Sequence, residues 1–281
     1  MSGPGRLLRS PSLVIGATAT GAMVAVAALA VVWTPRSPTA MAVAERLQGP
    51  SARHLLGTDP FGRDVASQLM VGATTSFAIA LAAIGLAMAV GTALGLIAAA
   101  RPGSFLSGLV LRVADFAFAF PVVLTAMLVA AIREPGAANV VAAVALFNVP
   151  VFVRLVRGAA LQVTALDFVA AARLAGLGEA RILIGEVLPN VLGPIVVQAT
   201  IQFALAILAE AGLSYLGLGV RPPAPSWGRM LAEAQTYMGR QPGLAIFPGL
   251  AIAVSVIGLN LLGDGLRDLL DPKGRRRLPS G

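Results

Sequence analysis

The chain has 281 residues, of which 57% are hydrophobic and only 12% are charged. An ordinary soluble domain is about 25% charged, so this composition indicates a membrane protein. The formal net charge of +8 comes almost entirely from arginine, without an aromatic and basic patch or a nucleic-acid-binding module, which argues against nucleic acid as a partner. The absence of cysteine excludes disulfides, zinc–thiolate sites and thiol nucleophiles.

Apolar runs of about twenty residues, the length that spans about 30 Å of hydrocarbon as a helix, recur along the chain. The first, residues 13–33, is longer than a signal-peptide core and predicts a transmembrane helix after a short N-terminus, residues 1–12. Five more runs lie within a core at 77–263, and they cover residues 77–100, 116–132, 140–153, 192–216 and 244–262. The predicted fold is an all-α membrane protein with six transmembrane helices.

The placement of basic residues predicts the orientation of these helices. If residues 1–12 are cytoplasmic, thirteen basic residues lie on the inner side and eight on the outer side, as the positive-inside rule requires. The basic tail, residues 264–281, then lies inside, and both termini are predicted to be cytoplasmic. The two long connecting segments, residues 34–76 and 217–243, are predicted to be extracytoplasmic.

Both outer segments contain signals of local structure. Asp59 belongs to a predicted turn, and Asp64 is a candidate N-cap of a short amphipathic helix. His54 is the only histidine and has no acidic or thiol cluster beside it in the sequence, so we expect a role in loop structure and not in metal binding. In the second segment a proline stretch leads into a predicted surface helix that starts at Trp227.

A polar segment interrupts the apolar runs on the inner side; residues 164–190 read TALDFVAAARLAGLGEARILIGEVLPN. Thr164 and Asp167 have the spacing of a capping box, which predicts a helix over residues 165–175 that ends at Gly176. A second short helix is predicted over residues 179–188, stopped by Pro189. The predicted result is a helix pair across the cytoplasmic mouth of the bundle.

One face of the first short helix is small except for a single aromatic side chain. Its residues follow the spacing i, i+3, i+4 and i+7: Phe168, Ala171, Ala172 and Ala175. A small face suits a tight protein groove, which favours docking of a partner. The alternative is an interfacial helix that rests on lipid headgroups, with Arg173 and Arg181 in the phosphate layer.

This segment resembles the EAA loop of bacterial ABC importer permeases, whose pattern is Glu-Ala-Ala, three residues, Gly, nine residues, Ile, one residue, Leu-Pro. In this chain Ala170 stands in place of the family Glu, and Glu186 in place of Ile. The resemblance implies a type I ABC importer permease fold with cytoplasmic EAA coupling helices in a coupling loop at 154–190. The residues expected to couple to an ATPase are Phe168, Ala171, Ala172, Gly176, Leu188 and Pro189.

The resemblance extends to three further stretches: HLLGTDPFGRDVASQL, ILAEAGLSYLGLGVRPPAPSWGRMLAEA and NLLGDGLRDLLDPK. These look like the C-type subunit of dipeptide, oligopeptide and nickel permeases. They imply a bacterial inner-membrane protein that pairs with a B-type permease, two cytoplasmic ABC ATPases and an extracytoplasmic substrate-binding protein. The chain has no G-x-x-x-x-G-K-[ST] loop, so no cofactor is expected in it, and ATP and Mg are expected on the partner ATPases.

Other functions stay open at this point. The same machinery could import nickel, haem or another small solute in place of peptides. A function of another class would be a stand-alone channel or a membrane enzyme with an intramembrane acidic group. Autonomous ion conductance or hydrolysis by the purified chain would separate that class from a permease.

Three polar residues of the fifth apolar run are candidates for the solute pathway. An ionisable residue such as Glu210 costs about 2.5–3.5 kcal/mol in a membrane helix unless it faces water or a partner; alternatively it lies near the outer end and is solvated. Gln198 and Gln202 share a helix face, which either lines a cavity or bonds to a neighbouring helix. Asp115 is predicted to form a helix-end ion pair with Arg112, one turn before it, at the cytoplasmic boundary; the alternative is a transport site.

Overall fold

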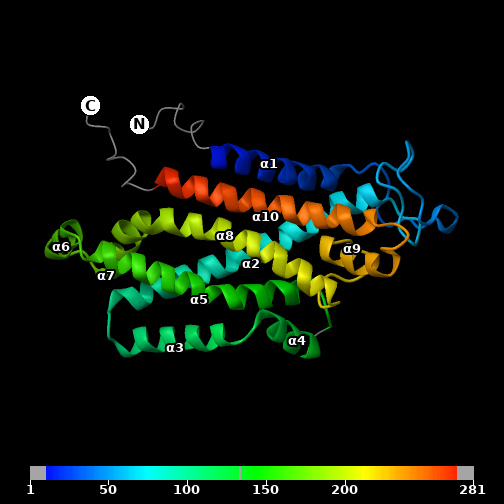
Figure 1. Cartoon of the computed structure of the whole chain (residues 1–281). Coiled ribbons are helices and arrows are strands. Elements are labelled where there is room, and N and C mark those ends of the chain that lie inside the picture. Colours follow the sequence, from blue (N-terminus) through cyan, green and yellow to red (C-terminus); the bar gives the residue numbers. More distant parts are fainter. Residues whose placement is uncertain (1–10, 133, 271–281) are drawn as a thin grey trace, which may run out of the picture.

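The computed structural model describes residues 11–132 and 134–270, and these form a bundle of α-helices (Figure 1). The helices are α1 (Pro11–Val32), α2 (Val65–Ala100), α3 (Phe105–Ala119), α4 (Val122–Ile132), α5 (Ala137–Thr164), α6 (Asp167–Leu174), α7 (Glu179–Ile182), α8 (Leu188–Tyr215), α9 (Trp227–Ala234) and α10 (Gly243–Leu270). Within the described residues, five helical stretches are long and apolar enough to cross a membrane, and α3 with α4 makes a sixth if that bent pair counts as one span. The all-α membrane fold is confirmed.

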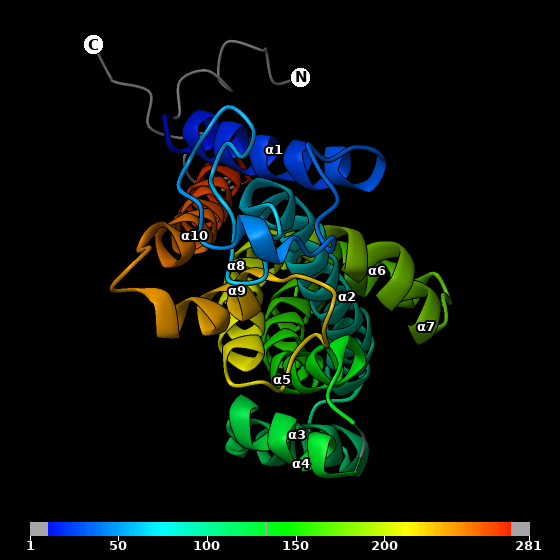
Figure 2. The same cartoon turned by 90° about the vertical axis from the view of Figure 1, so that its right-hand side faces the viewer.

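The helices form three layers around α2, α5 and α8 (Figures 1 and 2). α1 and α10 lie together on one side of these helices, and α3 and α4 lie on the other. The most extensive helix contact joins α2 to α5. Many of the fully buried core positions in these two helices are alanines, and such small side chains let membrane helices approach closely.

The bundle has two distinct ends (Figure 1). The first, here called the α6 end, carries α6, α7, the start of α1 and the end of α10, where Leu13 lies against Gly265. The second, the α9 end, carries residues 33–64 and α9. Among the described residues the arginines divide equally between the half of the bundle nearer the α6 end and the half nearer the α9 end, so the predicted orientation depends on Arg6, Arg9 and the cluster at 273–277, which lie outside the described residues.

The second span begins earlier than predicted. α2 starts at Val65 and not at residue 77, and Asp64 caps this long helix instead of a separate short one; its side chain accepts a hydrogen bond from the Ser67 N–H. The polar residues at the start of α2 hid this boundary in the sequence. Ser67, Gln68 and Ser76 are buried within the protein, so they do not interrupt a membrane helix.

The predicted third span over residues 116–132 is wrong. α3 and α4 meet there at an angle of 87°. Proline disfavours helical geometry in the preceding residue, and Phe120 is accordingly extended just before Pro121. α3 instead begins at Phe105, where the Ser104 hydroxyl accepts a hydrogen bond from the Ser107 N–H.

Two other spans extend beyond their predicted limits towards the α6 end. α5 continues from the apolar run at 140–153 to Thr164, and α10 continues from 244–262 to Leu270. Their last turns contain polar residues and lie outside the apolar runs from which the limits were predicted. The predicted C-terminal tail, residues 264–281, therefore begins inside a helix.

The outer helix begins at Trp227, as predicted, but it does not lie on the surface. Trp227 is buried, and its Nε1–H donates a hydrogen bond of 3.0 Å to the Leu69 carbonyl of α2. Its ring meets Phe77 edge to face, with centroids 5.9 Å apart. Gly228 lies against the backbone of Ala211, so α9 packs directly on α8.

Candidate functional site

The start of α6 differs from the prediction. Thr164 belongs to the last turn of α5, where its hydroxyl donates a hydrogen bond of 3.1 Å to the Leu161 carbonyl. The residue before α6 is Leu166, which makes no side-chain cap, so the predicted capping box is wrong. The continuation of α5 through Thr164 removes this side chain from the capping position.

The end of α6 is confirmed at Gly176. This residue has a φ of +80°, which favours glycine. The Gly176 N–H donates to the Arg173 carbonyl at 3.0 Å, and the Leu177 N–H donates to the Ala172 carbonyl at 3.2 Å. These two bonds form a Schellman motif, which reverses the chain between α6 and α7.

The predicted small face of α6 is only partly available to a partner. Val169 is fully buried and holds α6 against the bundle. Phe168 is 40% exposed, and Ala171 and Ala175 are also exposed. Ala172 is half-buried and packs against the core, so it lies at the edge of the face.

An unpredicted apolar residue joins this face. Leu174 is 90% exposed, and the helical spacing places it beside Ala171. We call the set Phe168, Ala171, Leu174 and Ala175 the coupling surface. It lies on a helix that projects from the end of the bundle (Figure 1). Exposed apolar side chains grouped in this way fit both interpretations of this face, docking of a protein partner and contact with the membrane interface.

Pro189 does not stop the second short helix, contrary to the prediction. α7 passes through a π-helical turn, Leu183–Val187, directly into α8, so that Glu179–Tyr215 is one helical stretch. The wider turn accommodates the missing N–H and the ring of Pro189. Asn190 Nδ2 donates a hydrogen bond of 2.6 Å to the Glu186 carbonyl there.

This continuity connects α7 directly to the membrane helix α8. Leu188 is half-buried and packs against the core, whereas Pro189 is exposed. Arg173 of α6 forms an ion pair of 2.8 Å with Glu179 of α7, which ties the two short helices together. Displacement of α6 is therefore expected to move α8.

Glu210 is fully buried where α2, α8 and the segment before α9 meet. Ser76 and Ser214 each donate a hydrogen bond of 2.7 Å to its carboxylate, and the Ser226 side chain is a third partner. Sequence alone did not identify these serines as partners, since only Ser214 is close in the chain. A pathway role for Glu210 stays a prediction.

The two glutamines on α8 lie in different surroundings. Gln202 is buried, whereas Gln198 borders a cavity of about 430 Å³ between α5, α8 and α10. Arg267 and Leu155 line the same cavity. Of the three predicted pathway residues, Gln198 is thus the one that lines an open space.

Asp115 does not pair with Arg112. It forms an ion pair of 2.6 Å with Arg154 of α5. The Arg154 guanidinium also lies over the Phe118 ring, 5.0 Å from its centroid. This pair joins residues 39 positions apart, so local spacing could not reveal it.

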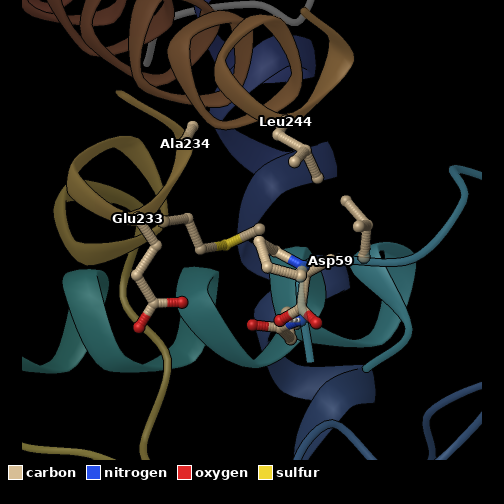
Figure 3. Close-up of a pocket in the computed structure, with 8 residues that line it drawn as sticks. Asp59, Glu233, Ala234 and Leu244 are labelled. Carbon is tan, nitrogen blue, oxygen red and sulfur yellow. Dashed lines mark hydrogen bonds between the residues drawn. The ribbon is translucent and has the colours of Figure 1, made fainter. Parts of the chain in front are cut away.

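A network of charged side chains connects the loop before α2 to α9 at the α9 end. The Asp59 carboxylate accepts hydrogen bonds from the Phe61 and Arg63 N–H groups, which confirms the predicted turn. The Arg63 side chain bridges Asp59 and Glu233, each at 2.5 Å. The pocket between Asp59, Glu233 and Leu244 (Figure 3) has a volume of about 20 Å³, enough for about one water, so it is too small for a solute.

His54 is part of the same end and is buried. Its Nδ1 lies 2.9 Å from Asp64 Oδ1, and its Nε2 lies 3.3 Å from Glu45 Oε2. The ring thus joins the loop to the start of α2. The predicted structural role of His54 is confirmed.

Asp64 links this loop to the pH dependence of stability. Burial would raise the pKa of its carboxyl, but hydrogen bonds from His54 and from the Ser67 N–H and hydroxyl outweigh burial and lower the pKa. A lowered folded-state pKa gives stability that is present above the unfolded value of about 3.9 and is lost as the pH falls through the folded value.

We therefore expect the melting temperature of the purified chain to decrease as the pH is lowered below about 4. The decrease should be smaller in Asp64→Asn. The variant should be less stable than wild type at neutral pH, and the curves of melting temperature against pH of the two proteins should converge at acidic pH. A constant difference between the curves at every pH would contradict this assignment.

Comparison with known proteins identifies the family. Residues 91–276 match the family described as the binding-protein-dependent transport system inner membrane component. The chain belongs to this family. It is therefore a multi-pass permease component of an ABC importer, and ATP hydrolysis belongs to partner subunits.

Similar proteins carry related names. The chain is 40% identical over 268 residues to the dipeptide transport system permease protein DppC of Alkalihalophilus pseudofirmus, covering 95% of this chain and 88% of that protein. It is 45% identical over 226 residues to the glutathione transport system permease protein GsiD of Pectobacterium atrosepticum, covering 80% and 75%. Both likenesses extend over most of each chain.

A solved structure supports the fold. The chain is similar to a structure of the MetNI methionine ABC transporter in an inward-facing conformation, with a TM-score of 0.61 and 17% identity over 73% of this chain and 96% of that chain. This likeness agrees with the predicted type I importer permease fold. In general, permeases of this family work with a second permease, ATPases and a binding protein.

Proposed function

We propose that this permease imports dipeptides or oligopeptides together with a B-type permease, and that one of two cytoplasmic ATPases docks on its coupling surface while the other docks on the B-type permease. An extracytoplasmic binding protein delivers the solute, and the ATPases bind ATP and Mg. Both termini and the α6 end face the cytoplasm. The names of the relatives support the solute class, because two of the most similar proteins are named as dipeptide and glutathione permeases.

The observation that carries the coupling role is the exposed apolar surface on α6. Val169 anchors this helix, and Leu174 and Phe168 stand out from it at the end of the bundle. The surface connects to α8 through an unbroken helical stretch from Glu179 to Tyr215. Closure of the ATPases on ATP binding can therefore move α8 and shift the balance between two states of the permease.

Crosslinking tests the docking directly, since the native chain has no cysteine. With Ala171→Cys and one cysteine in the groove of the candidate ATPase, we expect a disulfide whose yield changes with ATP. Ala253, an exposed alanine of α10, supplies the matched control, and Ala253→Cys should give no crosslink. Equal yields at both positions would contradict docking on α6, and labelling of residues 165–188 from the outer side would overturn the orientation.

The solute class needs a separate measurement. A ligand that binds the folded protein raises its melting temperature, so the purified binding protein should be stabilised by short peptides. Stabilisation by nickel or haem alone would favour those cargoes instead. Conductance by the permease chain alone would favour a channel.

A further inference from the structure

The Asp115–Arg154 pair is an unusual feature of the bundle surface. Its side chains are 64% and 46% exposed, so neither is enclosed by the described part of the chain. Both groups are fixed in place by the 2.6 Å contact and by the position of Arg154 over the Phe118 ring. The pair therefore presents one negative and one positive charge to whatever lies outside this face.

The pair lies at the depth of the hydrocarbon. α5 has 28 residues and is about 42 Å long at 1.5 Å per residue. Arg154 lies about 5 Å from the midpoint of this helix. The hydrocarbon extends about 15 Å to each side of the membrane centre, so a helix that crosses it places Arg154 well inside.

Lipid hydrocarbon is an unfavourable environment for this ion pair. Charged residues in membrane helices face the bundle interior, a partner or a water-filled cavity. Arg154 holds Asp115 and does not extend towards a headgroup, and an aspartate side chain is too short to reach one from this depth. Water or a polar partner must therefore cover this face.

The same face of α5 continues as a strip towards the α6 end. Arg154, Gly158 and Gln162 are spaced four residues apart and are all exposed. Gly158 has open space where a side chain would begin. A face in contact with lipid would carry apolar side chains, whereas this strip contains none at these three positions.

We propose that the strip formed by Asp115, Arg154, Gly158 and Gln162 lines the water-filled route of the solute. Asp115 contacts an ammonium group of the solute and Arg154 contacts a carboxylate. A fixed pair of opposite charges fits a zwitterion, which carries both groups. This assignment of the route rests on the proposed import of peptides and names the residues that contact the charged groups of the solute.

Cysteine labelling of the assembled complex in proteoliposomes tests whether water reaches the strip. We expect Gly158→Cys to react with a charged, membrane-impermeant methanethiosulfonate at least about tenfold faster than Val90→Cys or Ile97→Cys. Val90 and Ile97 are exposed residues of α2 whose distances from the α6 end bracket that of Gly158. Equally slow reaction at all three positions would overturn the proposal, because a partner or lipid would then cover the strip.

Uptake of radiolabelled alanyl-alanine tests the contact with the solute. Asp115→Asn and Arg154→Gln should each raise the KM for uptake by about tenfold, the effect of one lost charged hydrogen bond. For the N-acetylated dipeptide, which lacks the ammonium group, Asp115→Asn should leave the KM unchanged. The double variant D115R/R154D rebuilds the pair in reverse, and recovery of the wild-type KM in it would show a merely structural role and overturn the solute contact.

The coupling surface is unchanged in all these variants. The crosslink from Ala171→Cys to the ATPase therefore reports on the proposed function independently of the strip. Loss of that crosslink would refute ATPase docking on α6, whereas normal crosslinking with slow labelling at Gly158→Cys would refute only the route proposed here.

Discussion

Replacement of Ala171 by tryptophan is expected to reduce ATP-driven uptake by about tenfold while the chain still folds and inserts. Ala171 is exposed at the centre of the coupling surface, so an indole there can extend into solvent in the isolated permease. In a tight groove of the ATPase the same ring causes overpacking of about 1–3 kcal/mol, which corresponds to about 5- to 150-fold in affinity. Uptake and solute-stimulated ATP hydrolysis by the complete complex in proteoliposomes measure the effect.

The matched control is Ala253→Trp, the same substitution at an exposed alanine of α10 that lies about 26 Å along this helix from its end at the α6 end of the bundle. Its uptake should equal that of wild type. Ala172→Trp is a less clear test because Ala172 packs against the core, so a tryptophan there also destabilises the chain. Full uptake by Ala171→Trp would show that α6 does not enter a tight groove.

Residues 164–190 show which local sequence signals predict the helix boundaries correctly. Gly176 ends α6 as the sequence predicts, because a left-handed C-terminal residue depends only on its own helix. The predictions from Thr164 and Pro189 are wrong because the role of each residue depends on where the adjoining long helix ends or begins. α5 continues past the expected boundary at Thr164, and a π-helical turn carries the chain past Pro189 into α8.

The transmembrane helices show a second limit of prediction from the sequence. Apolar runs predict the number of spans because the bilayer requires a minimum length of apolar helix. They do not predict where a helix starts when its polar residues are buried in protein, as Ser76 is against Glu210. The break in the third span did have a signal, since Pro121 disfavours a helical conformation at Phe120.

Partners that come from distant parts of the chain could not be predicted. Asp115 has an arginine one turn away, yet it pairs with Arg154 because α3 packs beside α5. The docking of α2 on α5, in contrast, has a signal in the sequence. Gly91 and Gly95 form a G-x-x-x-G pattern within an apolar helix, which is typical of a close helix contact.

That contact carries the largest expected effect on stability. A Cβ atom at Gly91 would lie 2.5 Å from Phe152 Cβ and 2.9 Å from the Val149 carbonyl oxygen. The carbonyl belongs to the backbone of α5 and cannot turn aside, so Gly91→Val must separate the two helices that make the most extensive contact in the bundle. We expect a loss of about 1–3 kcal/mol or more in the free energy of unfolding, and a chain that accumulates poorly in the membrane.

Gly85→Val is the control, because it makes the same substitution in the same helix. A Cβ atom at Gly85 meets no heavy atom within 4 Å. Both variants gain the same small benefit from removing a flexible glycine, so the difference between them isolates the contact with α5. Thermal unfolding in detergent should therefore show a lower melting temperature for Gly91→Val than for Gly85→Val. Equal melting temperatures would mean that α5 does not lie against Gly91 at the distance described here.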